Sequence, residues 1–300
     1  MDSNILVIAA GMHSSIQDLG RKGYRSFGVP ISGTMDKYSA ILANKLLNNE
    51  EGLPVMEITI KGPKLFFEDE TLFVITGANM SPKLNDVPIH VNSVYAVKTG
   101  DVLSFGDLVY GSRAYIGVRG GFITEKVYDS FSYYPGITKA EKISKGDRLQ
   151  IASYSTELQI PLSKIKTDKN HFNTQKIEVT KGPGYHYLSK KQKEYVFSKK
   201  FEIDELNNRM GYQLKNNIPN AKKNEIITSA VIPGTVQLTP SGKLIILMRD
   251  CQTTGGYYRI LQLTDLAINQ LAQKKTGDSF KFVMESSYTF LNRLVGKWRD

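Results

Sequence analysis

One short segment occurs twice in the chain, and it constrains the fold more than any other feature. Residues 98–105 read KTGDVLSF, and residues 275–282 read KTGDSFKF. A related KGDRL stands at 145–149, near the end of the first half. A glycine-aspartate pair followed by apolar residues is typical of a turn that enters a strand. Two copies so far apart predict a duplicated β-rich domain, because solenoid repeats have periods of only about 20 to 50 residues.

Short strand patterns separated by turn signals fill much of the chain. We predict strands at 6–9, 55–60, 72–76, 113–118, 177–180, 234–238 and 243–248. The 300 residues are enough for two domains of about 150 residues each. Residues 158–173 are rich in lysine and lack periodicity, which is typical of a linker. The sequence therefore predicts a mainly β protein with domains at 1–165 and 172–300, each carrying a short helix.

Two helices and one long loop are predicted between these strands. Residues 36–47 form a helix with Tyr38, Ile41, Leu42 and Leu46 on its apolar face. Residues 263–275 form a second helix, capped by Thr264 and closed by Gly277. Residues 11–36 are rich in glycine and polar residues but also contain aromatic and aliphatic ones. We expect that segment to be a packed loop.

Composition and missing motifs exclude several classes of protein. The formal net charge is +10, but the lysines are scattered, with small groups at 190–200 and 222–223. No zinc-finger, RNA-recognition or helix-turn-helix pattern accompanies them, so we expect no nucleic-acid partner. No apolar run approaches the ~20 residues that span a bilayer, and the first residues are not a signal peptide. We therefore expect a cytoplasmic protein without a membrane partner.

The familiar cofactor and nucleophile motifs are also missing. The chain has no GxxxxGK[ST] and no GxGxxG that opens a helix, so it has no recognisable nucleotide motif of its own. It has no HExxH and its four histidines are isolated, so we predict no metal site. The single cysteine, Cys251, excludes an internal disulfide.

The densest group of functional side chains follows the most apolar predicted strand. Residues 243–248 read KLIILM, and the next nine read RDCQTTGGY. This stretch brings a cation, an anion, a thiol, an amide and two hydroxyls to one strand end, where sites often lie. The glycine pair lets a backbone approach a ligand closely. A ligand site and a plain polar turn are both consistent with the pattern.

Together these stretches resemble one family. They are SIQDLGR at 15–21, GVPISGTMD at 28–36, GSRAYIGVRGG at 111–121, NRMG at 208–211, GTVQ at 234–237 and RDCQTTGGY at 249–257. The sequence is similar to the family of the 5-oxoprolinase C subunit, also described as allophanate hydrolase subunit 2-like or biotin-dependent carboxyltransferase-like. One segment departs from it: the family usually has a Gly-Ser-x-Ser-Thr run where this chain has DSFSY at 129–133.

The resemblance implies a fold and a way of working. It implies two cyclophilin-like β-barrel domains, and partners resembling the B and A subunits of 5-oxoprolinase. That assembly uses ATP to open 5-oxo-L-proline, a small lactam, to L-glutamate. One alternative is biotin-dependent carboxyl transfer to urea or a similar amide, and another is a regulator that binds a sensor-kinase inhibitor. No Met-Lys-Met attachment site is present, so we expect no covalently bound biotin on this chain.

The resembling stretches supply the candidate site residues. Asp250 and Asp36 are the candidate catalytic carboxylates, since lactam opening needs a group that moves a proton. The alternatives are that Asp36 is a helix cap and that Asp250 is an ion-pair partner of Arg249 or Arg209. The candidate substrate-binding residues hold charge or orient an amide, and they are Gln17, Arg21, Thr34, Asn208, Arg209, Arg249, Gln252, Thr253, Thr254, Gly255, Gly256 and Tyr257.

Overall fold

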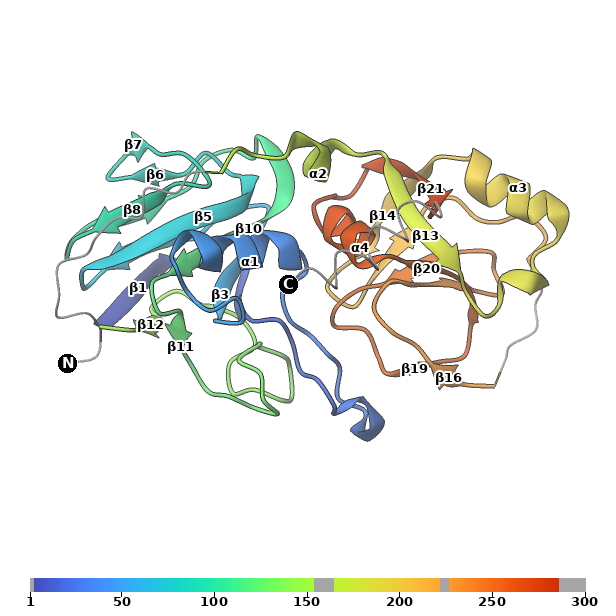
Figure 1. Cartoon of the computed structure of the whole chain (residues 1–300), viewed down its shortest axis with the longest axis horizontal. Coiled ribbons are helices and arrows are strands. Elements are labelled where there is room, and N and C mark those ends of the chain that lie inside the picture. Colours follow the sequence, from blue (N-terminus) through green and yellow to red (C-terminus); the bar gives the residue numbers. More distant parts are fainter. Residues whose placement is uncertain (1–2, 154–164, 222–226, 286–300) are drawn as a thin grey trace, which may run out of the picture. The chain divides into compact units, whose positions relative to one another are not determined.

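The computed structural model describes residues 3–153, 165–221 and 227–285 (Figure 1). Residues 158–164 of the predicted linker and the lysine pair 222–223 lie outside the described residues. The described chain divides into two compact units. The first contains Met1–Asn173 and Ala272–Lys275, and the second contains Thr174–Leu271 and the residues from Thr276 onward. None of the helices in the described ranges is long and apolar enough to cross a bilayer.

The first unit is built from two antiparallel sheets. One sheet has the strand order β11 (Phe122–Ile123), β12 (Arg148–Ile151), β1 (Ser3–Ala9), β4 (Lys64–Phe67), β9 (Val102–Ser104), β6 (Lys83–Leu84) and β7 (Val87–Pro88). The other has the order β2 (His13–Gln17), β3 (Val55–Thr59), β10 (Tyr110–Val118), β5 (Thr71–Asn79) and β8 (Val94–Val97). Ile5 and Phe67 of the first sheet share one core with Ile58, Ile75 and Ile116 of the second.

Helix α1 (Lys37–Leu46) packs against β5 and β10 on the other face of the five-stranded sheet (Figure 1). The prediction of its apolar face was partly wrong: Leu46 is buried as expected, but Tyr38 is exposed and the other buried apolar side chains are Ala40 and Ala43. Small residues are needed there because the helix and β10 approach closely. A Cβ on Gly117 would lie 3.2 Å from the Cβ of Ala43.

Strand β3 is covered on both faces as a result. Met56 and Ile58 point into the core between the sheets, whereas Val55 belongs to the cluster under α1. Glu57 alternates with Met56 and Ile58, so it lies on the helix side and is 1% exposed. An acidic side chain is thereby placed in the interior of the first unit.

The strands of the second unit close into a barrel. Their order is β13 (Lys176–Lys181), β20 (Tyr258–Leu263), β17 (Thr235–Leu238), β18 (Leu244–Leu247), β15 (Gly211–Leu214), β14 (Phe201–Asn207) and β21 (Ser279–Met284). The closing pair, β13 with β21, is parallel, and the other pairs are antiparallel. The predicted mainly β, barrel-containing fold is confirmed. The first unit differs in that its strands are divided between two sheets.

Helices and short segments complete both units. The second unit carries α3 (Lys190–Ser198), the 3-10 turn η2 (Tyr185–Tyr187), α4 (Asp265–Ala272) and a small ribbon of β16 (Ser229–Ala230) with β19 (Thr254–Gly255). The first carries the turn η1 (Arg25–Phe27) and α2 (Lys169–Asn173). Two predictions need correction. Residues 13–17 of the expected loop form strand β2, and α4 ends at Ala272 rather than at 275.

The repeated glycine-aspartate segment adopts one geometry at all three places. Gly100, Gly146 and Gly277 have φ values of 97°, 91° and 86°. Each donates its backbone N–H to a residue on a neighbouring strand: Phe67, Val7 or Ile203. That same residue donates its own N–H to the carbonyl of the following aspartate, at 2.9 to 3.0 Å. The turns predicted from sequence are therefore confirmed. At each of them the same pair of backbone hydrogen bonds joins the turn to a neighbouring strand.

Candidate functional site

Asp36 lies in the interior of the first unit, at the beginning of α1. Its side chain is 0% exposed and caps the helix by accepting a hydrogen bond from the N–H of Ser39 at 3.2 Å. The Ser39 hydroxyl donates to the other carboxylate oxygen at 2.7 Å. The helix-cap alternative is therefore present in the structure. A solvent molecule or a ligand has no direct route to this carboxylate while the surrounding residues stay in place.

Two residues far away in sequence complete the environment of Asp36. The imidazole Nε2 of His171, on α2, lies 2.7 Å from Oδ2, and the amide of Gln273 donates to the same oxygen at 2.8 Å. Burial acts most strongly on this carboxyl group and by itself raises its pKa. The hydrogen bond and charge of His171, with hydrogen bonds from Ser39 and Gln273, outweigh burial and hold the pKa of Asp36 below its usual value of 3.8.

The same network continues along the helix-covered face of the sheet. Tyr115 and Glu57 are opposite each other on β10 and β3, and the Tyr115 hydroxyl donates to Glu57 Oε2 at 3.0 Å. That hydroxyl also accepts from the Asp36 N–H at 2.8 Å. Burial, then the charges of Glu57 and Asp36, raise the pKa of Tyr115 well above 10.0. The Nε of Arg113 lies 3.8 Å from Oε1 of Glu57, and a terminal nitrogen of the same guanidinium donates to the Ala272 carbonyl at 2.6 Å.

Gln17, Arg21 and Thr34 are held in the loop around Asp18. All three are buried, with exposures of 1%, 1% and 0%. Arg21 donates to the Ser132 carbonyl, Gln17 to the Tyr133 carbonyl, and the Thr34 N–H to the Asp18 carbonyl. These contacts fix the loop that leads from β2 to α1. A direct contact of these side chains with a ligand would need this loop to open.

The DSFSY segment, where the chain departs from the expected pattern, supplies the donors for Asp18. The hydroxyls of Ser130 and Ser132 donate to Oδ1 at 2.7 and 2.6 Å, and the Phe131 N–H donates to Oδ2 at 2.7 Å. Gly20 donates its N–H to Oδ1 at 2.7 Å. The two serines thus bind a buried carboxylate of the protein itself.

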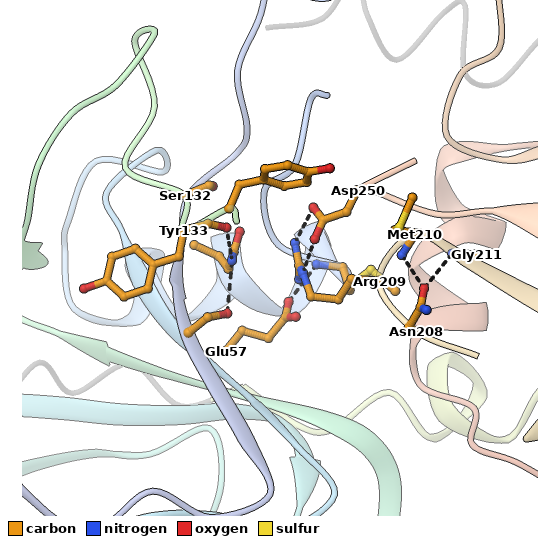
Figure 2. A network of polar contacts seen from close by, with 12 residues as sticks. Glu57, Ser132, Tyr133, Asn208, Arg209, Met210, Gly211 and Asp250 are labelled. Atoms are coloured by element: carbon orange, nitrogen blue, oxygen red, sulfur yellow. Dashed lines mark hydrogen bonds and ion pairs between the residues drawn. The ribbon is translucent and has the colours of Figure 1, made fainter. Parts of the chain in front are cut away.

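In the second unit, Arg209 and Asp250 form a two-pronged ion pair, shown in Figure 2. Nε and one terminal nitrogen of the guanidinium donate to the two carboxylate oxygens at 2.7 and 3.0 Å. The backbone N–H of Asp250 also donates to the Arg209 carbonyl at 2.9 Å. Asp250 is 6% exposed and the side chain of Arg209 is 11% exposed, so the pair is largely buried. The predicted alternative of an ion pair with Arg209 is thus the observed arrangement.

Asn208 shapes the turn that carries Arg209. Its side-chain oxygen accepts from the N–H groups of Met210 and Gly211 at 2.8 and 3.2 Å (Figure 2). Its own N–H donates to the Gly211 carbonyl at 3.1 Å. This asparagine turn joins β14 to β15 and directs Arg209 toward the strand end at Asp250.

The other residues of 249–257 take different places. Arg249 is 4% exposed and donates to Asn269 on α4 at 3.1 Å. Thr254 and Gly255 pair with β16, and the Thr253 carbonyl accepts from Val231 at 3.0 Å. Asn208, Gln252 and Tyr257 line a cavity of about 410 Å³ on the second unit. Arg209, Arg249 and Asp250 are not among the residues that line this cavity.

The comparisons with known proteins identify the family. Residues 27–284 match the family model described as carboxyltransferase domain, subdomain A and B. The chain belongs to this family. It is 32% identical over 280 residues to the C subunit of the Haemophilus influenzae 5-oxoprolinase, covering 90% of this chain and 87% of the relative. It is 30% identical over 289 residues to the Escherichia coli protein of the same name, with coverages of 92% and 90%.

A carboxyltransferase-domain relative of known structure has the same fold. The solved structure of the urea amidolyase of K. lactis superposes with a TM-score of 0.84 at 29% identity. The match covers 94% of this chain but 19% of that larger protein. The predicted resemblance is therefore confirmed, and the relatives carry the names of two different enzymes, as the C subunit of 5-oxoprolinase and as urea amidolyase.

Four residues that organise these networks were not predicted: Asp18, Glu57, His171 and Gln273. Asp18 stands inside the QDLGR motif, which pointed to its neighbours Gln17 and Arg21 instead. Glu57 alternates with apolar residues along its strand, and this pattern predicted only that it faces solvent. His171 falls in the predicted linker and Gln273 in the predicted helix, so neither carried a signal of its own.

Proposed function

We propose that the chain is a subunit of an ATP-dependent 5-oxoprolinase that opens 5-oxo-L-proline to L-glutamate. The observation that carries this proposal is reciprocal coverage. The chain and the two C subunits of 5-oxoprolinase correspond over about nine-tenths of both sequences. A urea amidolyase shares the domain but is several times longer. In this proposal it works in the cytoplasm with chains like the B and A subunits.

Asp250 is the carboxylate that we assign to proton transfer. Arg209 holds both of its oxygens in a fixed plane, and an arginine stays charged throughout the physiological pH range. A carboxylate held in this way can accept a proton from an amide nitrogen once a substrate displaces one of the two hydrogen bonds. Arg209 is then left to hold a negatively charged group of the substrate.

We assign Asp36 to positioning rather than to chemistry. Its two oxygens accept from Ser39, Gln273 and His171, and it is fully buried. Arg21 and Arg249 are 1% and 4% exposed, and they contact the protein itself. We therefore expect these three residues to support the site through the loops and strand ends that they hold.

The ATP of the reaction is assigned to a partner chain. A triphosphate needs cations or a row of backbone N–H groups at a helix start. The described cavity of the second unit is lined by Glu205 and by no lysine or arginine. Its residues do not fit a triphosphate, and the chain carries no Walker-type motif.

A second candidate function follows from the family itself. The matching model is a carboxyltransferase domain, and a urea amidolyase of Lachancea kluyveri is 31% identical over 308 residues. A biotin-dependent carboxyl transfer to an amide is the corresponding reaction, with biotin on a separate carrier. The third alternative is a regulator that binds its partner without turnover.

Reconstitution separates these functions. The full chain is combined with its partners, which resemble the B and A subunits, and ADP release is followed with and without 5-oxoproline. An oxoprolinase releases ADP only with 5-oxoproline and is insensitive to avidin. A carboxyltransferase requires a biotinylated protein and is inhibited by avidin, and a regulator binds without turnover. The isolated chain is expected to be inactive, and ATP-dependent turnover without partners would contradict the subunit role.

A further inference from the structure

The chain between the end of β13 and the beginning of β14 carries an unusual concentration of positive charge. Residues 181–200 contain six lysines and one glutamate, so a fifteenth of the chain holds +5 of its formal net charge of +10. Five of the lysines are exposed and Lys193 is half-buried. Surfaces of soluble domains usually mix charges of both signs, and this one does not. The six lysines, with two tyrosines beside them, form what we call the basic surface: Lys181, Tyr185, Lys190, Lys191, Lys193, Tyr195, Lys199 and Lys200.

The charge of the basic surface is not neutralised by the described part of the chain. None of its lysines has a carboxylate within ion-pair distance among the described residues. Other lysines of the same unit do: Lys215 lies 2.6 Å from Glu202, and Lys243 lies 3.0 Å from Asp204. The lysines of the basic surface are therefore available to an anion from outside.

Two tyrosine rings order these lysines. The Nζ of Lys193, on α3, lies 5.0 Å from the centre of the Tyr185 ring, and the Nζ of Lys181, at the end of β13, lies 5.4 Å from the same centre. Near the other end of α3, the Nζ of Lys199 lies 5.9 Å from the centre of the Tyr195 ring. The face of an aromatic ring attracts an ammonium group but does not cancel its charge. The cations are thus held in place and stay charged.

The lysines at the beginning of α3 do not stabilise the helix on which they lie. Ser189 and Gln192 form a capping box, so the helix start already has its partners, and the first turn contains no acidic residue. Lys190 and Lys191 occupy that turn instead. Positive charge is unfavourable at this end of a helix, because the helix dipole is positive there. Since local stability does not explain these lysines, a binding role does.

The chemistry of the basic surface favours an acidic polypeptide over nucleic acid or a membrane. Residues 181–200 contain no arginine, the side chain that most often reads bases. Bases stack on free aromatic faces, whereas the Tyr185 ring is in contact with two ammonium groups. Membrane binding needs apolar side chains that enter the bilayer, and Leu188 and Val196 are only 4% and 0% exposed.

We propose that the basic surface docks an acidic segment of a partner polypeptide. Lys190 and Lys199 are nine residues apart along α3, which corresponds to about 14 Å at a helical rise of about 1.5 Å per residue. An extended segment of about four or five residues has this length, at about 3.3 Å per residue. Such a segment is long enough for several carboxylates to meet the lysines. The proposal does not depend on which reaction the chain supports.

The test uses the full chain and measures peptide binding by fluorescence anisotropy at low salt. The probe is a labelled decapeptide of alternating glutamate and serine with blocked ends. Replacing Lys181 and Lys193 together by glutamine should weaken binding about three- to tenfold, the range for two exposed ion pairs. Replacing both by arginine keeps the charge and the contact with Tyr185, so binding should persist. The matched control, Lys64→Gln with Lys83→Gln on the first unit, removes the same charge and should weaken binding less than about twofold.

The control pair and two competing probes decide the outcome. Equal weakening by the two glutamine pairs would show that only the overall charge attracts the peptide, and would overturn the proposal. A hexanucleotide with the same number of negative charges, or phosphatidylserine vesicles, would also overturn it by binding more tightly than the peptide through Lys181 and Lys193. Loss of binding in the arginine pair would contradict a role for the two charges. Thermal unfolding of each variant should match that of the parent, because the replaced side chains are at the surface.

Discussion

Asp36 and Asp250 carry similar side chains in different surroundings. Asp36, in the first unit, is 0% exposed and accepts hydrogen bonds from Ser39 and Gln273 in addition to its contact with His171. Asp250, in the second unit, is 6% exposed, and the guanidinium of Arg209 holds both of its oxygens. The first carboxylate joins several segments of the chain, whereas the second is held by one charged side chain from a neighbouring turn.

The partners of the two carboxylates differ as well. Arg209 presents a planar, charged guanidinium to both oxygens of Asp250. Asp36 is bound instead by the imidazole of His171 and by two neutral donors, Ser39 and Gln273. The residue type of a carboxylate alone therefore does not indicate its role. The number and kind of its partners, and its access to solvent, do.

The largest expected effect is on stability, from Asp36→Asn. Asparagine removes a buried carboxylate that accepts hydrogen bonds from Ser39 and Gln273 and contacts His171, which costs about 1 to 3 kcal/mol of unfolding free energy at pH 7. The folded pKa of Asp36 lies below 3.8, so its contribution is complete above that pH and is lost as the pH falls through the folded pKa. The difference between parent and variant should therefore shrink below pH 3.8. Urea unfolding at several pH values measures it.

Glu51→Gln is the matched control for Asp36→Asn. It breaks the ion pair between Glu51 and Lys45, which lies on α1, the helix that Asp36 caps. The two side chains are 53% and 59% exposed. Exposed pairs contribute about 0 to 1 kcal/mol, so this variant should unfold like the parent. An Asp36→Asn protein that is as stable as the parent but inactive in the assembly would restore a chemical role for Asp36 and contradict the positioning role.

The next effect is on turnover, from Asp250→Asn. The substitution keeps the size of the side chain but removes the proton acceptor, so turnover of the reconstituted assembly should fall at least about tenfold. Folding and partner binding should persist, because the side-chain oxygen of asparagine can still accept a hydrogen bond from Arg209. Kinetic assays and thermal unfolding of the same preparations measure both properties.

Glu202→Gln serves as the control for this second variant. It breaks the exposed Lys215 pair, with its 2.6 Å contact in the same unit, and should leave turnover unchanged. Full activity of Asp250→Asn would reject the proton-transfer role. An Asp250→Asn protein that does not fold would show that the pair with Arg209 is structural, and the contrast with Asp36 would disappear.

Much of the fold was predictable because its signals are local. The apolar run before Arg249, the glycine-aspartate turns and the Thr264 cap each lie within a few residues of what they determine. Thr264 does accept from the Ala267 N–H at 3.2 Å. Strand β2 was missed because it lacks clear alternation and depends on its pairing with β3, a strand that lies well beyond the loop and α1 in sequence.

The buried networks were not predictable for a related reason. The partners of Asp36 lie 135 and 237 residues away, and neither His171 nor Gln273 stands in a motif. Glu57 alternates like a solvent-facing residue, and only the covering by α1 buries it. Asp250 was predicted either as a catalytic carboxylate or as an ion-pair partner. The sequence could not identify its partner, because Arg209 is 41 residues away along the chain.

The smallest expected effect is a loss of unfolding free energy when the glycine of the repeated turn is replaced by alanine, in the first unit or in the second. Gly100 and Gly277 have φ values of 97° and 86°, and a Cβ on either would meet no atom within 4 Å. Alanine at either place therefore adds backbone strain without a clash, at a cost of about 1 to 2 kcal/mol. Urea unfolding of the two variants should give equal losses. Gly52→Ala, where there is space and φ is not in the left-handed region, should cost nothing. Unequal losses for Gly100 and Gly277 would mean that the two turns, despite their matching hydrogen bonds, do not contribute equally to the two units.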